Sequence, residues 1–162
     1  MKIDPADLTE IFKQMLADQY AAEKKSAKLV AAMAKKVTTA ELRSAVSAEA
    51  TDVESHISRL SRALSAVKQK PTSQLAAIDE EILKLLKAAG AKGATIKKDV
   101  QLLHLFKLLF NSKVARYESL YRMATALDFP EHALLLEQCS KDNQNTFAYL
   151  NQVEQNVIYA GT

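Results

Sequence analysis

The sequence contains few of the residues that break, turn or cross-link a chain. Among its 162 residues, glycine and proline occur three times each, cysteine once, and tryptophan is absent. So few turn-forming residues exclude a β-sandwich, a β-barrel and a glycine-rich phosphate loop. The lone Cys139 excludes a disulfide framework, which suits a reducing cytosol, and we expect it to be an inert core thiol. Because 47 residues are alanine or leucine, the strongest helix formers, the composition predicts an all-α protein.

Long apolar runs are also lacking. The most apolar stretch, residues 102–110, is interrupted by His104 and Lys107, and it is far shorter than the roughly 20 residues that cross a bilayer. The N-terminal segment MKIDPADL has no apolar signal core. We therefore expect a single domain over residues 1–162 that lies in the cytoplasm and has no membrane partner.

Apolar residues recur three and four positions apart along most of the chain, which is the spacing of helices with one buried face. Asp4 and Pro5 form a helix start signal, and capping boxes at Thr38–Glu41 and Asp128–Glu131 mark two further starts. The predicted helices cover residues 5–36, 38–70, 72–89, 96–127 and 130–157.

The connections between these helices predict how they pack. Only about four residues separate the first two long helices, and the last two are equally close, so each pair should be antiparallel. A long connection that contains the short helix joins the two pairs. Ferritin-like proteins close a bundle in this way. The expected fold is therefore all-α, a ferritin-like four-helix bundle with one short extra helix in the long crossover.

Polar residues on faces that should be buried are the informative exceptions. Four lie on these faces, Gln19, Glu49, His56 and Asn143, and two carboxylates lie one position away, Glu23 and Glu118. A buried carboxylate needs a partner, because burying the bare charge costs several kcal/mol. Ferritin-like proteins use such carboxylates, together with Glu-x-x-His pairs, to hold two divalent cations for oxygen chemistry.

The pattern for a di-metal site is incomplete in this sequence. No Glu-x-x-His occurs. His56 follows Glu49 by seven positions, about 10 Å along a helix, which is too far for one ion to bind both easily. We expect Glu49 and His56 to be hydrogen-bonded residues that fix the helix register. Gln19 and Asn143 are expected to be partners in the same polar layer.

Two motifs point to a known family. The segment DQYAAEK at residues 18–24 is similar to a helix-one signature D-x-Y-x-A-E-K, and KVARYE at residues 113–118 is similar to K-V-E-H-Y-E. Residues 32–36, 39–42 and 57–60 add looser similarity. Together these segments resemble the YciF/YciE-type stress-induced ferritin-like family over nearly the whole chain. The resemblance implies a ferritin-like bundle, usually dimeric, that is linked to bacterial stress responses and has no well-defined biochemical role.

The resemblance also implies how much of the family's carboxylate site is kept. Its first-helix Glu matches Glu23, and the Glu near the middle of its fourth helix matches Glu118. The paired acids of its second helix fall on Thr51 and Asp52, so one is lost. In the last helix, an acidic triplet falls on residues 141–143, where Asp142 is the acid that remains.

The family's fourth-helix Glu-His pair falls on Ala115 and Arg116 and is lost. An arginine in place of an imidazole brings a fixed positive charge near the site. We expect Arg116 to pair with Glu23 or Glu118 and to replace the electrostatic role of a metal.

The preferred hypothesis is a non-enzymatic ferritin-like bundle with a degenerate metal site, no cofactor and a structural or interaction role in bacterial stress. The stretch at residues 102–110 is apolar almost all round its helix, which favours a homodimer. The alternative is a di-iron or di-manganese carboxylate protein that handles oxygen or peroxide. Its candidate metal ligands are Glu23, Glu49, Asp52, His56, Glu118 and Asp142.

A third hypothesis rests on charge. Residues 84–122 carry nine Lys or Arg against two acids, a local charge of +7. A polyanion-binding face would use the lysines of that segment, Lys84, Lys87, Lys92, Lys97, Lys98 and Lys107. The whole chain carries only +3, so a nucleic acid partner is not expected.

Overall fold

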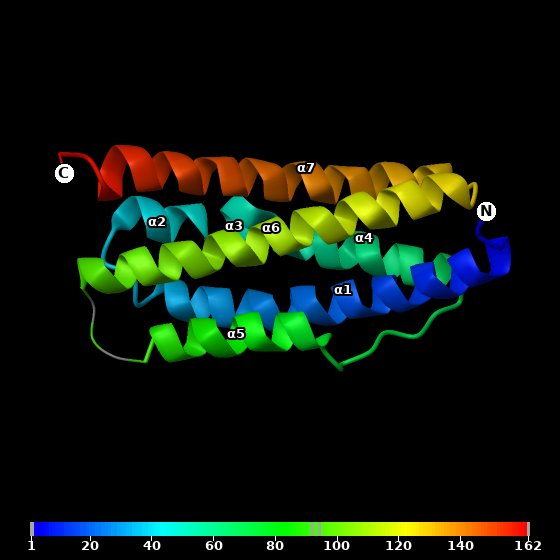
Figure 1. The fold of residues 1–162 in the computed structure, drawn as a ribbon, viewed down its shortest axis with the longest axis horizontal. Coiled ribbons are helices and arrows are strands. Elements are labelled where there is room, and N and C mark those ends of the chain that lie inside the picture. Colours follow the sequence, from blue (N-terminus) through cyan, green and yellow to red (C-terminus); the bar gives the residue numbers. More distant parts are fainter. Residues whose placement is uncertain (1, 92, 94, 162) are drawn as a thin grey trace.

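The computed structural model describes residues 2–91, 93 and 95–161. This part of the chain forms seven α-helices and one π-helical turn, without any strand (Figure 1). The elements are α1 (Pro5–Ala34), α2 (Ala40–Ala45), α3 (Ala48–Thr51), α4 (Val53–Ala66), α5 (Ala77–Ala89), α6 (Ile96–Ala126), α7 (Pro130–Val153) and the π-helical turn η1 (Glu154–Ile158). The predicted all-α fold is confirmed.

Four long segments lie side by side in the bundle: α1, the α2–α4 segment, α6 and α7 (Figure 1). Helices α6 and α7 form an antiparallel hairpin, and α4 packs against both α1 and α7. The crossover between α4 and α6 contains α5, which lies outside the bundle against α1 and α6. The four-helix bundle with one short helix in its long crossover is therefore confirmed.

The helix starts follow only one of the three predicted signals. The Asp4 side chain accepts a hydrogen bond from the Ala6 amide (2.7 Å) and caps α1, as predicted. The two capping boxes are wrong. Thr39, and not the predicted Thr38, precedes α2, and its hydroxyl donates to the buried Asp99 carboxylate (2.7 Å) instead of capping the helix. Asp128 has φ 59° and lies just after the end of α6, so Phe129 precedes α7.

The second long helix is interrupted, contrary to the prediction of one helix over residues 38–70. Helix α2 ends at Ala45, and the Ser47 hydroxyl accepts from the Ala50 amide (3.1 Å) to start α3. Asp52 then adopts a left-handed conformation (φ 49°) that separates α3 from α4. The break removes Glu49 from the buried face that a continuous helix would give it, and this residue is exposed.

The interior consists of two apolar clusters with a polar layer between them. One cluster joins the ends of α1 and α7 to the start of α6, and the other joins the opposite ends of the bundle. Along α1, Glu23 lies between Ala17 of one cluster and Val30 of the other. Along α6, Lys113 lies between Phe110 and Tyr117 in the same way. The buried polar residues thus occupy the middle of the bundle.

The apolar stretch of α6 is mostly used within the chain. Its buried members, Leu102, Leu103, Phe106, Leu109 and Phe110, belong to one core cluster. Helix α6 needs apolar residues on several sides because it contacts α1, α5, α7 and η1. Only Leu108 of the stretch is a large exposed hydrophobic residue (43%). In the described ranges, no helix is both long enough and apolar enough to span a membrane.

Candidate functional site

The centre of the polar layer is the carboxylate of Glu23, which is fully buried on α1. Its Oε2 atom lies 2.7 Å from the Lys113 Nζ atom. Its Oε1 atom accepts hydrogen bonds from the Tyr117 hydroxyl (2.9 Å) and from the Gln19 side-chain amide (3.2 Å). One turn of α1 and one turn of α6 therefore supply three donors to a single carboxylate.

Lys113 reaches this position because of its register on α6. Together with Phe106, Phe110 and Tyr117 it recurs four, three and four positions apart, so it shares their buried face. Its side chain is only 6% exposed. A buried ammonium is stable only beside a compensating charge, and Glu23 provides that charge.

His56 on α4 lies between two carboxylates. Its Nδ1 atom is 3.6 Å from Glu23 Oε1, and its Nε2 atom is 3.2 Å from Asp142 Oδ2 on α7. The imidazole is buried and meets the Tyr117 ring edge-on, with the ring centroids 5.8 Å apart. His56 thus connects the carboxylate on α1 with the carboxylate on α7.

The layer ends near the surface at Arg59. Its Nη1 atom lies 2.9 Å from Asp142 Oδ2, and its Nη2 atom lies 3.7 Å from Asp52 Oδ2. From Lys113 through Glu23, His56 and Asp142 to Arg59, basic and acidic groups alternate across the four long segments of the bundle. Each carboxylate in the middle of this series has a basic group on both sides.

Arg116 does not pair with Glu23 or Glu118, which corrects the expectation from the sequence. Its Nη1 atom donates to the Gln19 side-chain oxygen (2.9 Å) and lies 2.9 Å from Asp79 Oδ2. Asp79 is on α5 and buried, so α5 holds the guanidinium at the edge of the layer. The cation beside Glu23 is the ammonium of Lys113.

The charges shift the pKa values of the carboxylates in the layer. Burial alone would raise the pKa of Glu23, but Lys113 and His56 outweigh it and lower the pKa to about 2. Burial also acts to raise the pKa of Asp142, yet hydrogen bonds from Gln138 and Arg59 and the contact with His56 lower it. Both carboxylates are therefore ionised at neutral pH.

The other two titratable groups of the layer respond mainly to burial. Burial raises the pKa of the Tyr117 hydroxyl well above its ordinary value, and the Glu23 charge adds to the effect. Burial raises the pKa of the Cys139 thiol to about 12, although its Sγ atom lies 3.7 Å from Arg59 Nη1. Neither group is ionised at neutral pH.

The structure brings together some of the predicted metal ligands and separates others. Glu23, His56 and Asp142 meet in the layer, and half-exposed Asp52 lies at its outer end. Exposed Glu49 contributes nothing there. Glu118 instead accepts a hydrogen bond from Gln144 near the surface (3.1 Å).

These residues fit a pair of divalent ions poorly. Asp52, His56 and Asp142 each offer an atom within 4.8 Å of the others, but the Arg59 guanidinium already contacts both acids. The Lys113 ammonium likewise lies against the Oε2 atom of Glu23 that a metal would need. Two side-chain cations thus already neutralise the carboxylates that a metal ion would need.

Sequence reasoning missed Lys113, Arg59 and Asp79. The signal for Lys113 was its spacing from Phe106, Phe110 and Tyr117, which places it on the buried face in place of Val114. Arg59 follows His56 by three positions, so the two share one face of α4. No sequence pattern indicated Asp79, because its burial depends on where α5 packs.

Some of the lysines proposed for a polyanion-binding face have acidic partners within the chain or are buried. Lys84 pairs with Glu81 on α5, and Lys107 pairs with Glu154. Lys98 is buried, while Lys92 lies outside the described residues. Much of this local charge is therefore neutralised within the chain.

Several solved structures share this fold. The Escherichia coli stress protein YciF has a TM-score of 0.85 at 20% identity, with 96% of this chain and 97% of that chain covered. The protein YcfI from Rhodopseudomonas palustris has a TM-score of 0.82 at 20% identity, covering 90% and 94%. A protein from Xanthomonas campestris has a TM-score of 0.75 at 17% identity, covering 95% and 94%.

At these identities the similarity establishes the fold alone. No curated protein matches the sequence. A family model described as a domain of unknown function, DUF892, matches residues 7–161, almost the entire chain. This chain, with its bundle and its alternating charged layer, therefore belongs to the DUF892 family.

Proposed function

We propose that this protein is a non-enzymatic bundle of the ferritin-like class with a degenerate metal site, in which an internal ion pair replaces the metal. One contact carries this conclusion: the buried Lys113 ammonium lies 2.7 Å from the buried Glu23 carboxylate. A carboxylate that is already neutralised by an ammonium has little affinity for a divalent ion, because the ion would have to displace a cation of the protein itself.

A structural or interaction role in bacterial stress follows from this proposal. The E. coli protein of similar fold is named a stress protein, and the resemblance of the motifs at residues 18–24 and 113–118 points to the same family. A layer of charges inside a bundle fixes which helix faces meet, which suits a scaffold more than a reaction site.

Metal analysis tests the proposal directly. The protein is purified aerobically and then loaded with Fe²⁺ or Mn²⁺, and its metal content is measured by mass spectrometry. We expect far less than one ion per chain, with no change in Glu23→Gln or Asp142→Asn. The exposed Glu49→Gln variant is the matched control. A content of two ions per chain that Glu23→Gln abolishes and Glu49→Gln preserves would overturn the proposal.

The second candidate is the di-iron or di-manganese protein that handles oxygen or peroxide. It is favoured by the cluster of Asp52, His56 and Asp142, whose potential ligand atoms lie within 4.8 Å of one another. For this function, Arg59 would have to leave both acids and Lys113 would have to leave Glu23. Oxygen or peroxide consumption that depends on the loaded metal would establish it in place of the first proposal.

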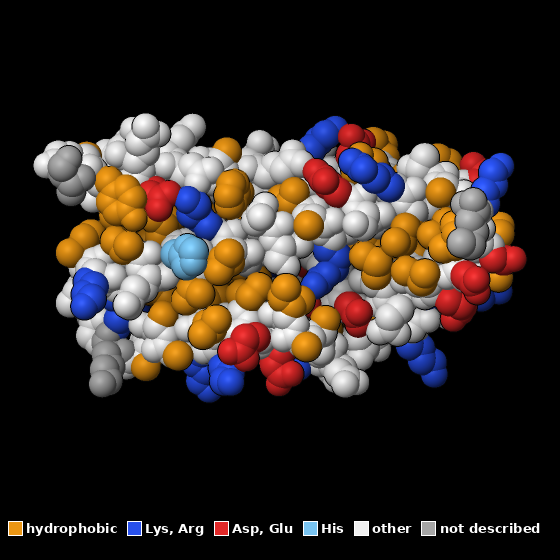
Figure 2. Space-filling model, viewed as in Figure 1, with side chains coloured by type: hydrophobic (Ala, Val, Ile, Leu, Met, Phe, Trp, Pro, Cys, Tyr) orange, Lys and Arg blue, Asp and Glu red, His pale blue; other side chains and the backbone are white. Residues whose placement is uncertain are grey.

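We further propose that the protein is a homodimer that pairs through the α5–α6 face. Ile78 (60% exposed), Leu85 (45%) and Leu108 (43%) lie on these two helices. Figure 2 shows hydrophobic side chains gathered along this face. A second copy of the chain can cover such a face through a two-fold axis, since the patch would pack against itself. Sedimentation of a monomer at about 50 µM, far above the Kd range of stable complexes, would contradict this proposal.

A further inference from the structure

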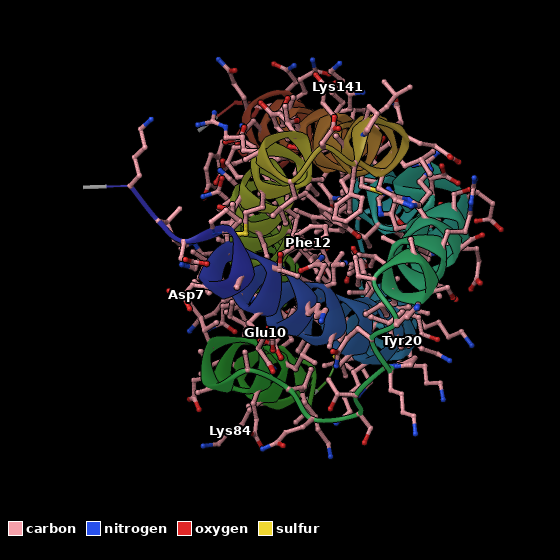
Figure 3. The ribbon with its side chains drawn as sticks, turned by 90° about the vertical axis from the view of Figure 1, so that its right-hand side faces the viewer. Asp7, Glu10, Phe12, Tyr20, Lys84 and Lys141 are labelled. Atoms are coloured by element: carbon pink, nitrogen blue, oxygen red, sulfur yellow. The ribbon has the colours of Figure 1, made fainter. Side chains whose placement is uncertain are left out.

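A hollow of about 490 Å³ lies between α1 and the extended crossover segment that follows α4. Viewed along the bundle, Tyr20 lies on the side of α1 next to this segment, whereas Phe12 points into the interior (Figure 3). Tyr20 and Pro71 line the hollow, and so do Lys24, Lys25 and Lys28. It faces away from the buried layer, so the proposed structural role does not use it.

None of the lysines that line this hollow forms an ion pair, although Lys28 also lines a second hollow together with Glu54. Residues 19–36 and 66–76 contain a single carboxylate, Glu23, which is buried against Lys113. Within the described chain, the ammonium groups of Lys24, Lys25 and Lys28 all lie more than 4.0 Å from any carboxylate. Some lysines elsewhere do pair with acids, such as Lys141 with Glu137 and Lys84 with Glu81.

The spacing of these residues concentrates the charge. Tyr20, Lys24 and Lys28 follow one another at four-residue intervals and therefore share one face of α1. The Lys24 Nζ atom lies 5.5 Å from the centre of the Tyr20 ring, which holds the ammonium beside the hollow. Repulsion among like charges at this spacing is relieved when an anion binds between them.

The opposite wall comes from the crossover. Thr72 and Ser73 contribute hydroxyl-bearing residues to the lining. Ammonium groups and hydroxyls together are the donors that bind phosphate oxygens. A volume of 490 Å³ lies within the range of small-molecule sites, roughly 300–1,000 Å³.

We propose that this hollow binds a small anion that carries two or more phosphate groups. The three lysines that line the hollow match a ligand with several negative charges better than a single carboxylate. The crossover wall limits the ligand to the size of a nucleotide. The same ammonium and hydroxyl groups would bind inorganic pyrophosphate or the diphosphate of a nucleotide.

Calorimetric titration in about 50 mM salt, where charge interactions are weakly screened, tests this site. The probes are inorganic pyrophosphate, ADP and adenosine. We expect pyrophosphate or ADP to bind with a Kd below about 1 mM and adenosine not to bind. Equal affinity for the first two would identify the diphosphate as the recognised group, and tighter binding of ADP would identify a nucleotide as the source.

The variant Lys24→Gln/Lys25→Gln/Lys28→Gln should weaken binding at least tenfold. The control Lys2→Gln/Lys87→Gln/Lys97→Gln removes the same charge from exposed lysines elsewhere and should change affinity less than twofold. All six side chains are exposed, so circular dichroism should be unchanged in both variants.

Three results would overturn the inference. The first is no binding of either phosphate compound at 5 mM, several times the Kd expected above. The second is an equal loss of affinity in the control variant, which would indicate attraction by net charge alone. The third is binding of a 20-nucleotide single strand while neither small compound binds, which would indicate a nucleic acid surface instead.

Discussion

At the scale of single residues, the charge of Glu23 depends strongly on its neighbours. Its carboxylate is fully buried and meets donors from Lys113, Tyr117 and Gln19, with His56 slightly farther away. A buried charge is strongly destabilising when its partner is removed, whereas removal of both charges is often tolerated. The effect of a substitution here therefore depends on which partner remains.

The Lys113→Met variant should be about 3–5 kcal/mol less stable than the wild type, because it leaves Glu23 buried without its ammonium. The double variant Glu23→Gln/Lys113→Met removes both charges and should recover most of that loss. Urea unfolding monitored by circular dichroism measures both. A single variant as stable as the wild type would mean that the ion pair does not hold this layer together.

Stability should fall in acid because of Glu23. Its pKa is about 2 in the folded state and 4.5 ordinarily, so the folded protein binds this proton more weakly than the unfolded chain does. The stabilisation is complete above pH 4.5 and is lost as the pH falls towards 2. The shift corresponds to about 3 kcal/mol.

Urea unfolding between pH 7 and pH 2 measures this loss. In Glu23→Gln/Lys113→Met, the free energy of unfolding should decrease by about 3 kcal/mol less than in the wild type. Asp142, whose pKa is also lowered, contributes to the decrease in both proteins. Identical pH profiles for the two proteins would show that Glu23 is not held ionised by its partners.

Cys139 should not react with a thiol reagent in the native protein. The side chain is buried, and its pKa of about 12 leaves almost no thiolate at pH 8. Absorbance of the released thiol dye should appear only at the rate of unfolding, whereas the urea-denatured chain should react at once. Rapid native labelling would mean that the layer opens near Arg59.

At the scale of secondary structure elements, the sequence predicted where helices lie better than how they end. The residue ranges of α1 and α6 agree closely with the periodic pattern, because long amphipathic segments determine them. The breaks at Ser47 and Asp52 were missed, because apolar spacing continues through them and an aspartate in the left-handed conformation leaves no pattern. The first capping box failed because α2 begins one residue later, after Thr39, whose hydroxyl donates to Asp99. The second failed because Asp128 ends α6 instead of starting α7.

Asp128→Gly should raise stability by about 1 kcal/mol, because glycine adopts φ 59° without the strain of a Cβ atom. The Asp128 and Phe129 amides bond back to Thr125 and Ala124 in the terminal turn of α6, and this arrangement remains in the variant. Asp128→Ala is the control and should gain nothing. Thermal unfolding measures both, and a loss of stability in the glycine variant would indicate that Asp128 caps α7 after all.

At the scale of the whole molecule, the two hairpins and the crossover between them could be predicted from the lengths of the connections and the positions of proline and glycine. The composition of the polar layer could be predicted only in part. Gln19, His56 and Asn143 are buried as their spacing indicated, and Glu23 is buried as well. Arg116 was expected as the partner of Glu23 because it falls where the family has an imidazole, whereas the spacing of Lys113 was the better signal. The contact of Arg116 with Asp79 could not be predicted, because it depends on where α5 packs.

Leu108→Glu should convert the proposed dimer to a monomer without loss of helicity. Leu108 lies on the outward side of α6 and is 43% exposed, so the change affects the face and not the core. Analytical ultracentrifugation measures the mass. Leu134→Glu is the matched control, because Leu134 is 67% exposed and lies on α7, outside the proposed interface. This substitution should leave the dimer intact.

The crossover helix α5 does more than connect the two hairpins. Its Asp79 holds the Arg116 guanidinium, so that only the Gln19 amide lies between that group and Glu23. The acid on this peripheral helix thereby keeps the guanidinium at the edge of the polar layer, while the ammonium of Lys113 occupies its centre. In a relative without this aspartate, the arginine would no longer be held at the edge. The ion pairs of the interior would then change although every residue of the four main segments stayed the same.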